Sequence, residues 1–198
     1  MKITIHQPEH FPYMGFFQKM KEADLFVVLD NVKFRKNYFQ NRNKFKNKND
    51  MDEWFGVSVP KKSTSKMIKD IVPIDSKINN WNKKVVSKLK HHFNVDFSDI
   101  YGLPTLLEIN MGSIEWARKK LNITNEIVFA SQLKVSGDKS ELLANICKNL
   151  GATTYISGPS GKEYLDLKHF DNINVEFFEP NVQNFYSCIY NIKLMEKK

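Results

Sequence analysis

The chain has 198 residues, of which 41% are hydrophobic and 13% are aromatic. This apolar content supports a folded core and excludes an intrinsically disordered chain. The formal net charge of +8 favours an anionic partner: a nucleic acid, an anionic membrane surface or a phosphate-bearing small molecule. The two cysteines, Cys147 and Cys188, make neither a disulfide framework nor a metal-binding spacing, and they fit a reducing compartment.

Targeting and membrane signals are not recognised in the sequence. The first residues lack the apolar run of a secretory signal, and no stretch approaches the roughly 20 apolar residues that a bilayer-spanning helix needs. We therefore expect a cytoplasmic protein without a membrane span, folded as one α/β domain over residues 1–198.

The start of the chain predicts a strand, a turn, a helix and a second strand. Residues 2–6 form a short apolar strand, residues 13–22 a helix, and residues 25–29 a continuous apolar run that ends at Asp30. A continuous apolar run is typical of a strand covered on both faces of a parallel sheet. These elements make a βαβ unit and predict a Rossmann-like, mainly parallel sheet with flanking helices.

The middle of the chain is predicted to hold a basic segment, a hairpin and helices. Residues 31–46 alternate basic, aromatic and amide side chains. Residues 54–60 and 67–74 read as strands joined by a polar turn, which predicts a β-hairpin. Two apolar stripes of helical period follow, and they predict a helical insertion at about 76–122 that packs against the core.

The last third returns to an α/β pattern. Apolar strands are predicted at residues 126–130, 153–156 and 175–178. The helix between the first two is predicted to begin at a capping box over residues 138–141 and to end at Gly151.

The first candidate segment for a functional site follows the first strand. It contains His6, Gln7, His10 and Tyr13, and ligands of open α/β sheets bind at the carboxyl ends of strands. His6 and His10 lack the H-E-x-x-H pattern of a zinc site, so no metal site is predicted. Each imidazole either makes its hydrogen bonds within the turn, which is a structural role, or contacts a phosphate or an oxyanion of a ligand.

The second candidate segment is the basic one. Its bases and aromatic rings suit single-stranded nucleic acid, or a mobile loop that clamps the phosphates of a nucleotide, with Arg42 as a fork-shaped donor. A solvated basic loop is the structural alternative. The residues predicted to bind here are Lys36, Asn41 and Arg42. Asp30, just before the segment, is a candidate acid, base or partner of a ribose hydroxyl.

The third candidate segment is a glycine-containing turn after the strand at 153–156. It is not a Walker motif, because Ile156 stands in place of the first glycine and Glu163 in place of the Ser/Thr. Backbone N–H groups of such a turn can approach an anion, although an ordinary glycine turn explains it equally well. The residues predicted to bind are Ser157, Gly158, Ser160, Gly161 and Lys162.

Several blocks of the sequence resemble the WbqC-like family. They are His6-Gln7-Pro8, Pro12-Tyr13 with Gly15-Phe16-Phe17, Ala23-Asp24, Asp30 with Phe34, Lys36 and Asn41-Arg42, the block at 136–140, Gly151-Ala152 with the block at 155–158, and the block at 161–165. The resemblance covers most of the chain and is weaker from Pro180 on. A more distant similarity is to the nucleotidyltransferase superfamily with a His-x-Gly-His signature, although the spacing from His10 to Gly15 departs from that motif.

Members of the WbqC-like family are usually encoded among genes for bacterial O-antigen and other surface polysaccharides. The resemblance therefore implies that pathway, and our hypothesis is a transferase that moves an acyl or aminoacyl group onto a nucleotide-linked amino sugar. The group would come from an acyl adenylate formed with ATP or from a carrier-bound acyl donor. His6 and His10 would stabilise negative charge or move a proton, and Asp30 would bind a hydroxyl or amine of the acceptor.

Two alternatives stay open. One is nucleotidyl transfer, and the other is a non-catalytic basic module that binds RNA or single-stranded DNA. Binding by charge alone would weaken steeply with salt. Fold analogy does not decide between these functions.

Overall fold

The computed structural model describes residues 1–197. The chain divides into two compact units. The first comprises Met1–Gln7, Gly15–Asp30 and Ile123–Gln183, and the second comprises Pro8–Met14, Asn31–Asn122 and the residues from Asn184 on. The predicted helical insertion lies within the second unit, and the single-domain organisation stays a prediction.

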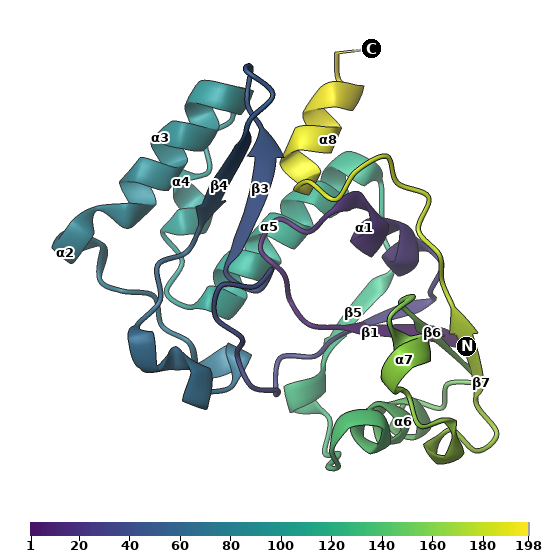
Figure 1. Cartoon of the computed structure of the whole chain (residues 1–198). Helices are drawn as coiled ribbons and strands as arrows, with labels where there is room; N and C mark the ends of the chain where they lie inside the picture. The colour runs from purple at the N-terminus through teal and green to yellow at the C-terminus, as the bar shows by residue number, and fades with distance from the viewer. Residues whose placement is uncertain (198) are drawn as a thin grey trace. The chain divides into compact units, whose positions relative to one another are not determined.

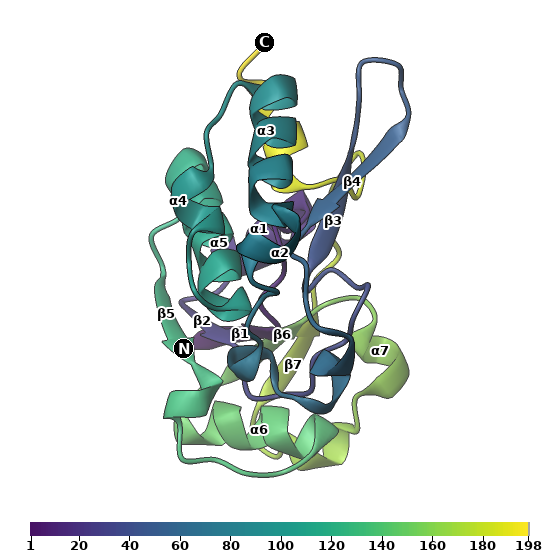
Figure 2. The same cartoon turned by 90° about the vertical axis from the view of Figure 1, so that its left-hand side faces the viewer.

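The first unit is built on a five-stranded sheet in the order β5-β2-β1-β6-β7 (Figures 1 and 2). Its strands are β1 (Lys2–His6), β2 (Leu25–Val28), β5 (Glu126–Phe129), β6 (Thr154–Ser157) and β7 (Asn174–Phe177). All neighbouring pairs are parallel. β2 and β6 are buried at every position, whereas the edge strands β5 and β7 each begin with an exposed residue. The expected Rossmann-like parallel sheet is confirmed, and burial on both faces explains its apolar runs.

Helices cover both faces of this sheet. Figures 1 and 2 show α1 (Met14–Lys21) on one face and α6 (Lys139–Asn149) on the other. α1 buries Phe16, Phe17 and Met20, and α6 buries Leu142 and Ile146 among others. The remaining elements are the short helix α7 (Gly161–Tyr164) and the 3-10 turns η3 (Ala130–Gln132) and η4 (Leu167–His169).

The two ends of α6 test the predicted stop and start signals. Gly151 follows the helix with a φ of 66°, which confirms it as a C-terminal stop. At the other end, Asp138 precedes the helix but its side chain makes no capping hydrogen bond. The predicted capping box at this position is therefore wrong, although the helix begins where it was expected.

The second unit combines a two-stranded antiparallel hairpin with helices. β3 (Arg42–Lys46) pairs with β4 (Asp52–Gly56). The helices are α2 (Ser76–Asn79), α3 (Trp81–Phe93), α4 (Ser98–Tyr101), α5 (Leu106–Leu121) and α8 (Cys188–Met195), with 3-10 turns η1 (Lys61–Ser65) and η2 (Ile68–Asp70). Phe11 lies at the centre of the core, where its ring contacts those of Phe55 and Phe97. α3 and α5 confirm the two predicted helical stripes.

The hairpin differs from the predicted one. Residues 67–74 hold the 3-10 turn η2 rather than a strand, and the partner of β4 is β3, which lies inside the predicted basic loop. Along β3, Asn43 and Phe45 are buried while the three basic residues between and beside them are half-buried. This alternation of burial has the period of a strand. Both faces of β3 carry polar residues, however, so the sequence lacks the alternation of apolar and polar residues that would predict a strand.

Asparagine and threonine define several helix ends in the second unit. Asn80, Asn94 and Asn122 follow α2, α3 and α5 with φ values of 52°, 52° and 53°. Asparagine tolerates this left-handed conformation and commonly ends helices. α5 begins at a reciprocal capping box between Thr105 and Glu108, which the sequence analysis did not place.

The two cysteines lie in the protein core. Cys147 and Cys188 are buried and free, and burial raises the pKa of Cys147 to about 12, so this cysteine acts as an inert core side chain.

Among residues 1–197, no helix has the length and the apolar character needed to span a bilayer. In the same range, no group of three or more His, Cys, Asp or Glu side chains is arranged to hold a metal ion.

Candidate functional site at the carboxyl edge of the parallel sheet

The order of the strands in the first unit reverses between β1 and β6. From β1 the chain adds β2 and then β5 on one side, and it then adds β6 and β7 on the other. At such a reversal the connections diverge, and open α/β sheets bind ligands in the crevice outside the carboxyl ends of the strands. β1 and β6 are parallel, with Thr4 opposite Ile156. The polar residues at their ends, His6 and Ser157, therefore lie at the same edge.

His6 is half-buried at the end of β1. Its Nδ1 lies 2.9 Å from the carbonyl oxygen of Gln7, and its ring meets that of Phe16 edge-on at 4.8 Å. Burial and the charge of Lys19 lower the pKa of His6 to about 3, although the bond to Gln7 opposes this effect. The imidazole is therefore neutral at pH 7.

This contact also fixes the tautomer of His6. A carbonyl oxygen only accepts hydrogen bonds, so the proton of the neutral ring resides on Nδ1 and donates to Gln7. Nε2 then carries a lone pair. The sequence predicts a contact with a phosphate or an oxyanion, but this tautomer presents an acceptor, which suits the N–H or O–H of a ligand.

Lys19 is a residue near this edge that the sequence analysis missed. It lies on α1, its exposed fraction is only 4%, and it is close enough to His6 for its charge to lower the pKa of that imidazole. A buried ammonium group favours nearby negative charge. The available signal was its spacing: Lys19 is three residues after Phe16 and therefore lies on the apolar face of the helix.

The turn after β6 needs glycine at one position and tolerates other residues at another. A Cβ on Gly161 would collide with the side chain of Ser157, whereas a Cβ on Gly158 would meet open space. The N–H of Gly161 donates to Gly158 (3.0 Å) and that of Lys162 to Pro159 (3.2 Å). Both backbone donors are thus used inside the turn, and the anion-binding role of this turn stays a prediction.

The side chains of the turn after β6 differ in whether they are exposed and free to contact a ligand. Ser157 is buried, with an exposed fraction of 1%, and Ser160 is exposed. Lys162 is also exposed and pairs with Glu179 at 2.7 Å. The Ser160 hydroxyl is therefore the predicted side chain of this turn that is best placed to meet a ligand.

Asp30 follows β2 and is buried, with an exposed fraction of 1%. Its Oδ1 accepts the N–H of Ser131 (2.9 Å) and its Oδ2 accepts the Ser131 hydroxyl (2.6 Å). These bonds join the end of β2 to the turn that follows β5, which is a structural role. The catalytic role predicted for Asp30 stays a prediction.

His10 belongs to the second unit and has no exposed surface. Its Nε2 lies 2.8 Å from the Tyr101 hydroxyl, and its Nδ1 lies 3.2 Å from Oδ1 of Asn110. Nδ2 of Asn110 donates to the carbonyls of Pro8 and Gln40, so Oδ1 accepts the proton of Nδ1 and the Tyr101 hydroxyl donates to Nε2. Burial lowers the pKa of His10 to about 3. Both ring nitrogens are satisfied, and its catalytic role stays a prediction.

Two residues of the basic segment have structural contacts within the second unit. Asn41 is buried, accepts the N–H of Asn37 (3.0 Å) and donates to the carbonyl of Val57 (3.1 Å). The guanidinium of Arg42 lies 4.4 Å from the ring centre of Trp54. Arg42 begins the strand β3, and the binding roles predicted for Asn41 and Arg42 stay predictions.

Tyr13 and Lys36 complete the predicted set. The ring of Tyr13 lies 5.5 Å from that of Phe185, and burial together with the charge of Glu9 raises the pKa of the Tyr13 phenol. Tyr13 is therefore a neutral hydrogen-bonding group. Lys36 is half-buried ahead of β3, and its phosphate-binding role stays a prediction.

Comparisons with known proteins extend this description. The model of the WbqC-like protein family matches residues 7–191, which include both Gln7 and the turn after β6 and continue past Pro180. The uncharacterized protein Rv1507c of Mycobacterium tuberculosis is 26% identical over 187 residues, which are 88% of this chain and 79% of that protein. No solved structure matches the chain.

Proposed function

Because this chain belongs to the WbqC-like protein family, we propose that it is a transferase in the synthesis of bacterial surface polysaccharide, O-antigen included. It moves an acyl or aminoacyl group onto the amino group of a nucleotide-linked sugar. The reaction takes place at the switch-point site, by which we mean His6, Gln7, Ser157, Gly158 and Ser160.

One observation carries this proposal: the strand order reverses between β1 and β6. The reversal gathers residues that are about 150 positions apart in the chain at one sheet edge, as the pairing of Thr4 with Ile156 requires. Crevices of this kind hold nucleotides in other α/β proteins. The charge of Lys19, which acts on His6, supports an anionic ligand such as the diphosphate of a nucleotide-linked sugar.

The tautomer of His6 supports a role as general base. The amine of the acceptor sugar attacks the acyl carbon, a C–N bond forms, and the bond from that carbon to the sulfur of a carrier thioester or to the phosphate oxygen of an acyl adenylate breaks. The amine must lose a proton, and Nε2 of His6 accepts it. A bound phosphate raises the pKa of a nearby imidazole, so the ligand itself improves this base.

A module that binds nucleic acid is the second candidate, and one observation favours it. The side chain of Trp54 in β4 is 44% exposed and carries Arg42 at 4.4 Å and Lys44 at 5.7 Å from its ring centre. An exposed ring with adjacent cations is the usual platform for stacking bases. In this case a Trp54→Ala variant would lose salt-sensitive binding of oligonucleotides, and His6→Ala would retain it.

Thermal-shift and product measurements on the full chain test the transferase proposal. We expect a UDP- or dTDP-linked amino sugar to raise the melting temperature by binding the folded state, and mass spectrometry to detect the acylated sugar when a donor is added. A carboxylic acid with ATP, which together give an acyl adenylate, is compared with a carrier thioester as the donor. A product with a new phosphoanhydride would instead assign nucleotidyl transfer.

His169→Ala is the matched control for His6→Ala. His169 is a half-buried histidine of the same unit, but it precedes β7 and so belongs to the amino end of that strand. We expect His6→Ala to lower kcat about 100-fold, as loss of a general base does, and His169→Ala to leave kcat unchanged. Equal kcat values for the wild type and His6→Ala would refute the assignment.

A further inference from the structure

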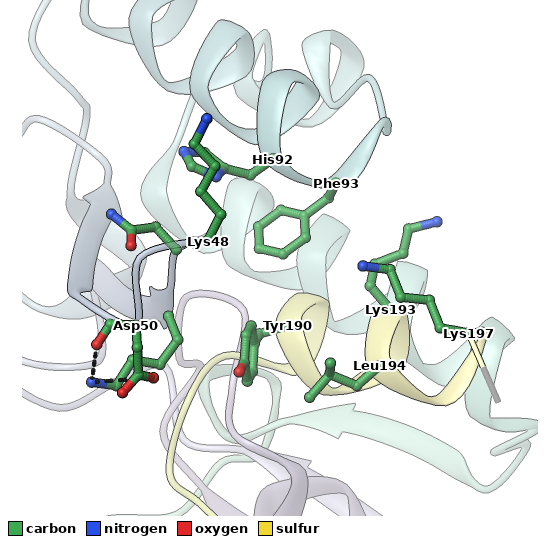
Figure 3. A pocket seen from close by; sticks show the side chains of 10 residues that line it. Lys48, Asp50, His92, Phe93, Tyr190, Lys193, Leu194 and Lys197 are labelled. Atoms are coloured by element: carbon green, nitrogen blue, oxygen red, sulfur yellow. Dashed lines mark hydrogen bonds and ion pairs between the residues drawn. The ribbon is translucent and has the colours of Figure 1, made fainter.

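The second unit contains a cavity that none of the predicted site residues line. Its volume is about 410 Å³, within the usual range for small-molecule sites. Three elements surround it: the β3–β4 turn, the last turn of α3 and the helix α8 (Figure 3). We call it the hairpin-tip pocket, and its lining includes Lys46, Lys48, Phe93, Tyr190, Lys193 and Lys197.

The lining carries an excess of positive charge. Four lysines face one carboxylate, that of Asp50, whose side chain is 91% exposed. Lys46 is bonded to Asp52 at 3.3 Å, and Lys193 to Glu196 at 2.6 Å. Within residues 1–197, no ion pair is formed by the remaining two lysines, Lys48 and Lys197, which are exposed. These two ammonium groups are the ones available to an anion.

Helix electrostatics explain only part of this charge. Lysines near the carboxyl end of α8 complement the partial negative charge of the helix end, which accounts for Lys193 and Lys197. Lys48 lies in the turn between β3 and β4, where no helix end requires it. Cations from the hairpin and from α8 therefore meet at one cavity, although these elements are far apart in the sequence.

Two aromatic rings, those of Phe93 and Tyr190, line the pocket. In the view of Figure 3, the rings of Phe93 and Tyr190 lie between Lys48 on one side and Lys193 and Lys197 on the other. Phe93 is fixed by an edge-on contact with Phe45 at 4.8 Å, and Tyr190 by an edge-on contact with Tyr186 at 5.4 Å. Fixed rings of this kind offer an apolar surface to a planar ligand at little cost in conformational entropy.

From this combination we infer that the hairpin-tip pocket binds a nucleoside phosphate. The phosphates contact Lys48 and Lys197, and the base packs against Phe93 and Tyr190. Aromatic surface and phosphate-binding cations serve the two halves of one nucleotide, whereas a simple anion would use only the lysines. The inference concerns the second unit alone and does not rest on the proposed transferase activity.

Calorimetric titration of the full chain with ATP, tripolyphosphate and adenosine tests this inference. We expect ATP to bind more tightly than either fragment, because only ATP uses both halves of the pocket. The double variant Lys48→Gln/Lys197→Gln should weaken ATP binding about tenfold, and Tyr190→Leu should weaken ATP while leaving tripolyphosphate unchanged. Equal affinities for ATP and tripolyphosphate would overturn the inference.

A control variant separates local contacts from net charge. Lys61→Gln/Lys62→Gln removes the same charge from exposed positions of η1 in the same unit, and it should retain ATP affinity. A second control, His6→Ala, distinguishes this site from the switch-point site. If His6→Ala abolishes ATP binding and Lys48→Gln/Lys197→Gln does not, the nucleotide belongs to the first unit and the inference about the second is wrong.

Discussion

The first unit presents His6 at the edge of a parallel sheet, and the second unit holds His10 inside a polar cluster. Both pKa values are lowered to about 3, mainly by burial, and both rings are neutral at pH 7. The difference is in their partners. His6 donates from Nδ1 to Gln7 and leaves Nε2 for a ligand, whereas Tyr101 and Asn110 occupy both nitrogens of His10.

This comparison teaches that a shifted pKa alone does not identify a catalytic residue. Desolvation acts on both imidazoles in the same direction, so it cannot distinguish a base at a ligand site from a structural histidine. The two histidines do differ in the number of ring nitrogens that have a hydrogen-bond partner within the protein. His6 therefore enters the proposed mechanism, whereas a catalytic role of His10 stays a prediction.

The largest expected effect contrasts the stability of two alanine variants. His10→Ala should lower the free energy of unfolding by about 3 kcal/mol or more, because it opens a cavity and leaves the buried Tyr101 hydroxyl and Asn110 Oδ1 without partners. His6→Ala should cost about 1 kcal/mol, since its ring is only half-buried. Urea denaturation measures both values, and equal costs would contradict the comparison.

The pH dependence of stability gives a smaller effect with a definite sign. An unfolded histidine has a pKa of about 6.5, so between that pH and 3 the unfolded chain binds protons that the folded chain does not. The contribution of these buried histidines to the free energy of unfolding is fully present above pH 6.5 and is lost as the pH falls. His10→Gln removes one of the two contributing groups, and its loss of stability from pH 6 to pH 5 should be smaller than that of the wild type by about 1 kcal/mol.

His91→Gln is the control for this measurement, because His91 is an exposed histidine on α3 of the same unit. Denaturation curves at pH 5, 6 and 7 supply the data. If His91→Gln and His10→Gln change the pH dependence equally, the burial of His10 does not affect its titration.

A third comparison concerns two glycines at the sheet edge. Gly161→Ala places a Cβ against the side chain of Ser157 and should cost about 1–3 kcal/mol, as overpacking does. Gly158→Ala meets open space and should change stability by less than about 0.5 kcal/mol. Thermal melts of the two variants make the comparison, and a reversed order would show that the turn is packed differently.

The local pattern of the sequence determined most of the first unit. Continuous apolar runs predicted the strands, helical spacing predicted α1 and α6, and the strand ends predicted that His6 and the turn at Ser157 are candidate site residues. The inferences about strands and helices succeed because a strand buried on both faces and an amphipathic helix leave periodic signatures in neighbouring residues. The choice of His6 and Ser157 as site residues stays a prediction. The WbqC-like resemblance, carried by several short blocks, was confirmed by the family match over residues 7–191.

Only the tertiary structure decided the features that depend on contacts between residues far apart in the sequence. The strand pairing of β3 with β4, the burial of Lys19, the two donors to Asp30 from Ser131 and the enclosure of His10 by Tyr101 and Asn110 all depend on such partners. The hairpin-tip pocket likewise forms from three elements that are separate in the sequence. Burial and hydrogen-bond satisfaction are properties of the packed chain, so the residue type alone cannot specify them.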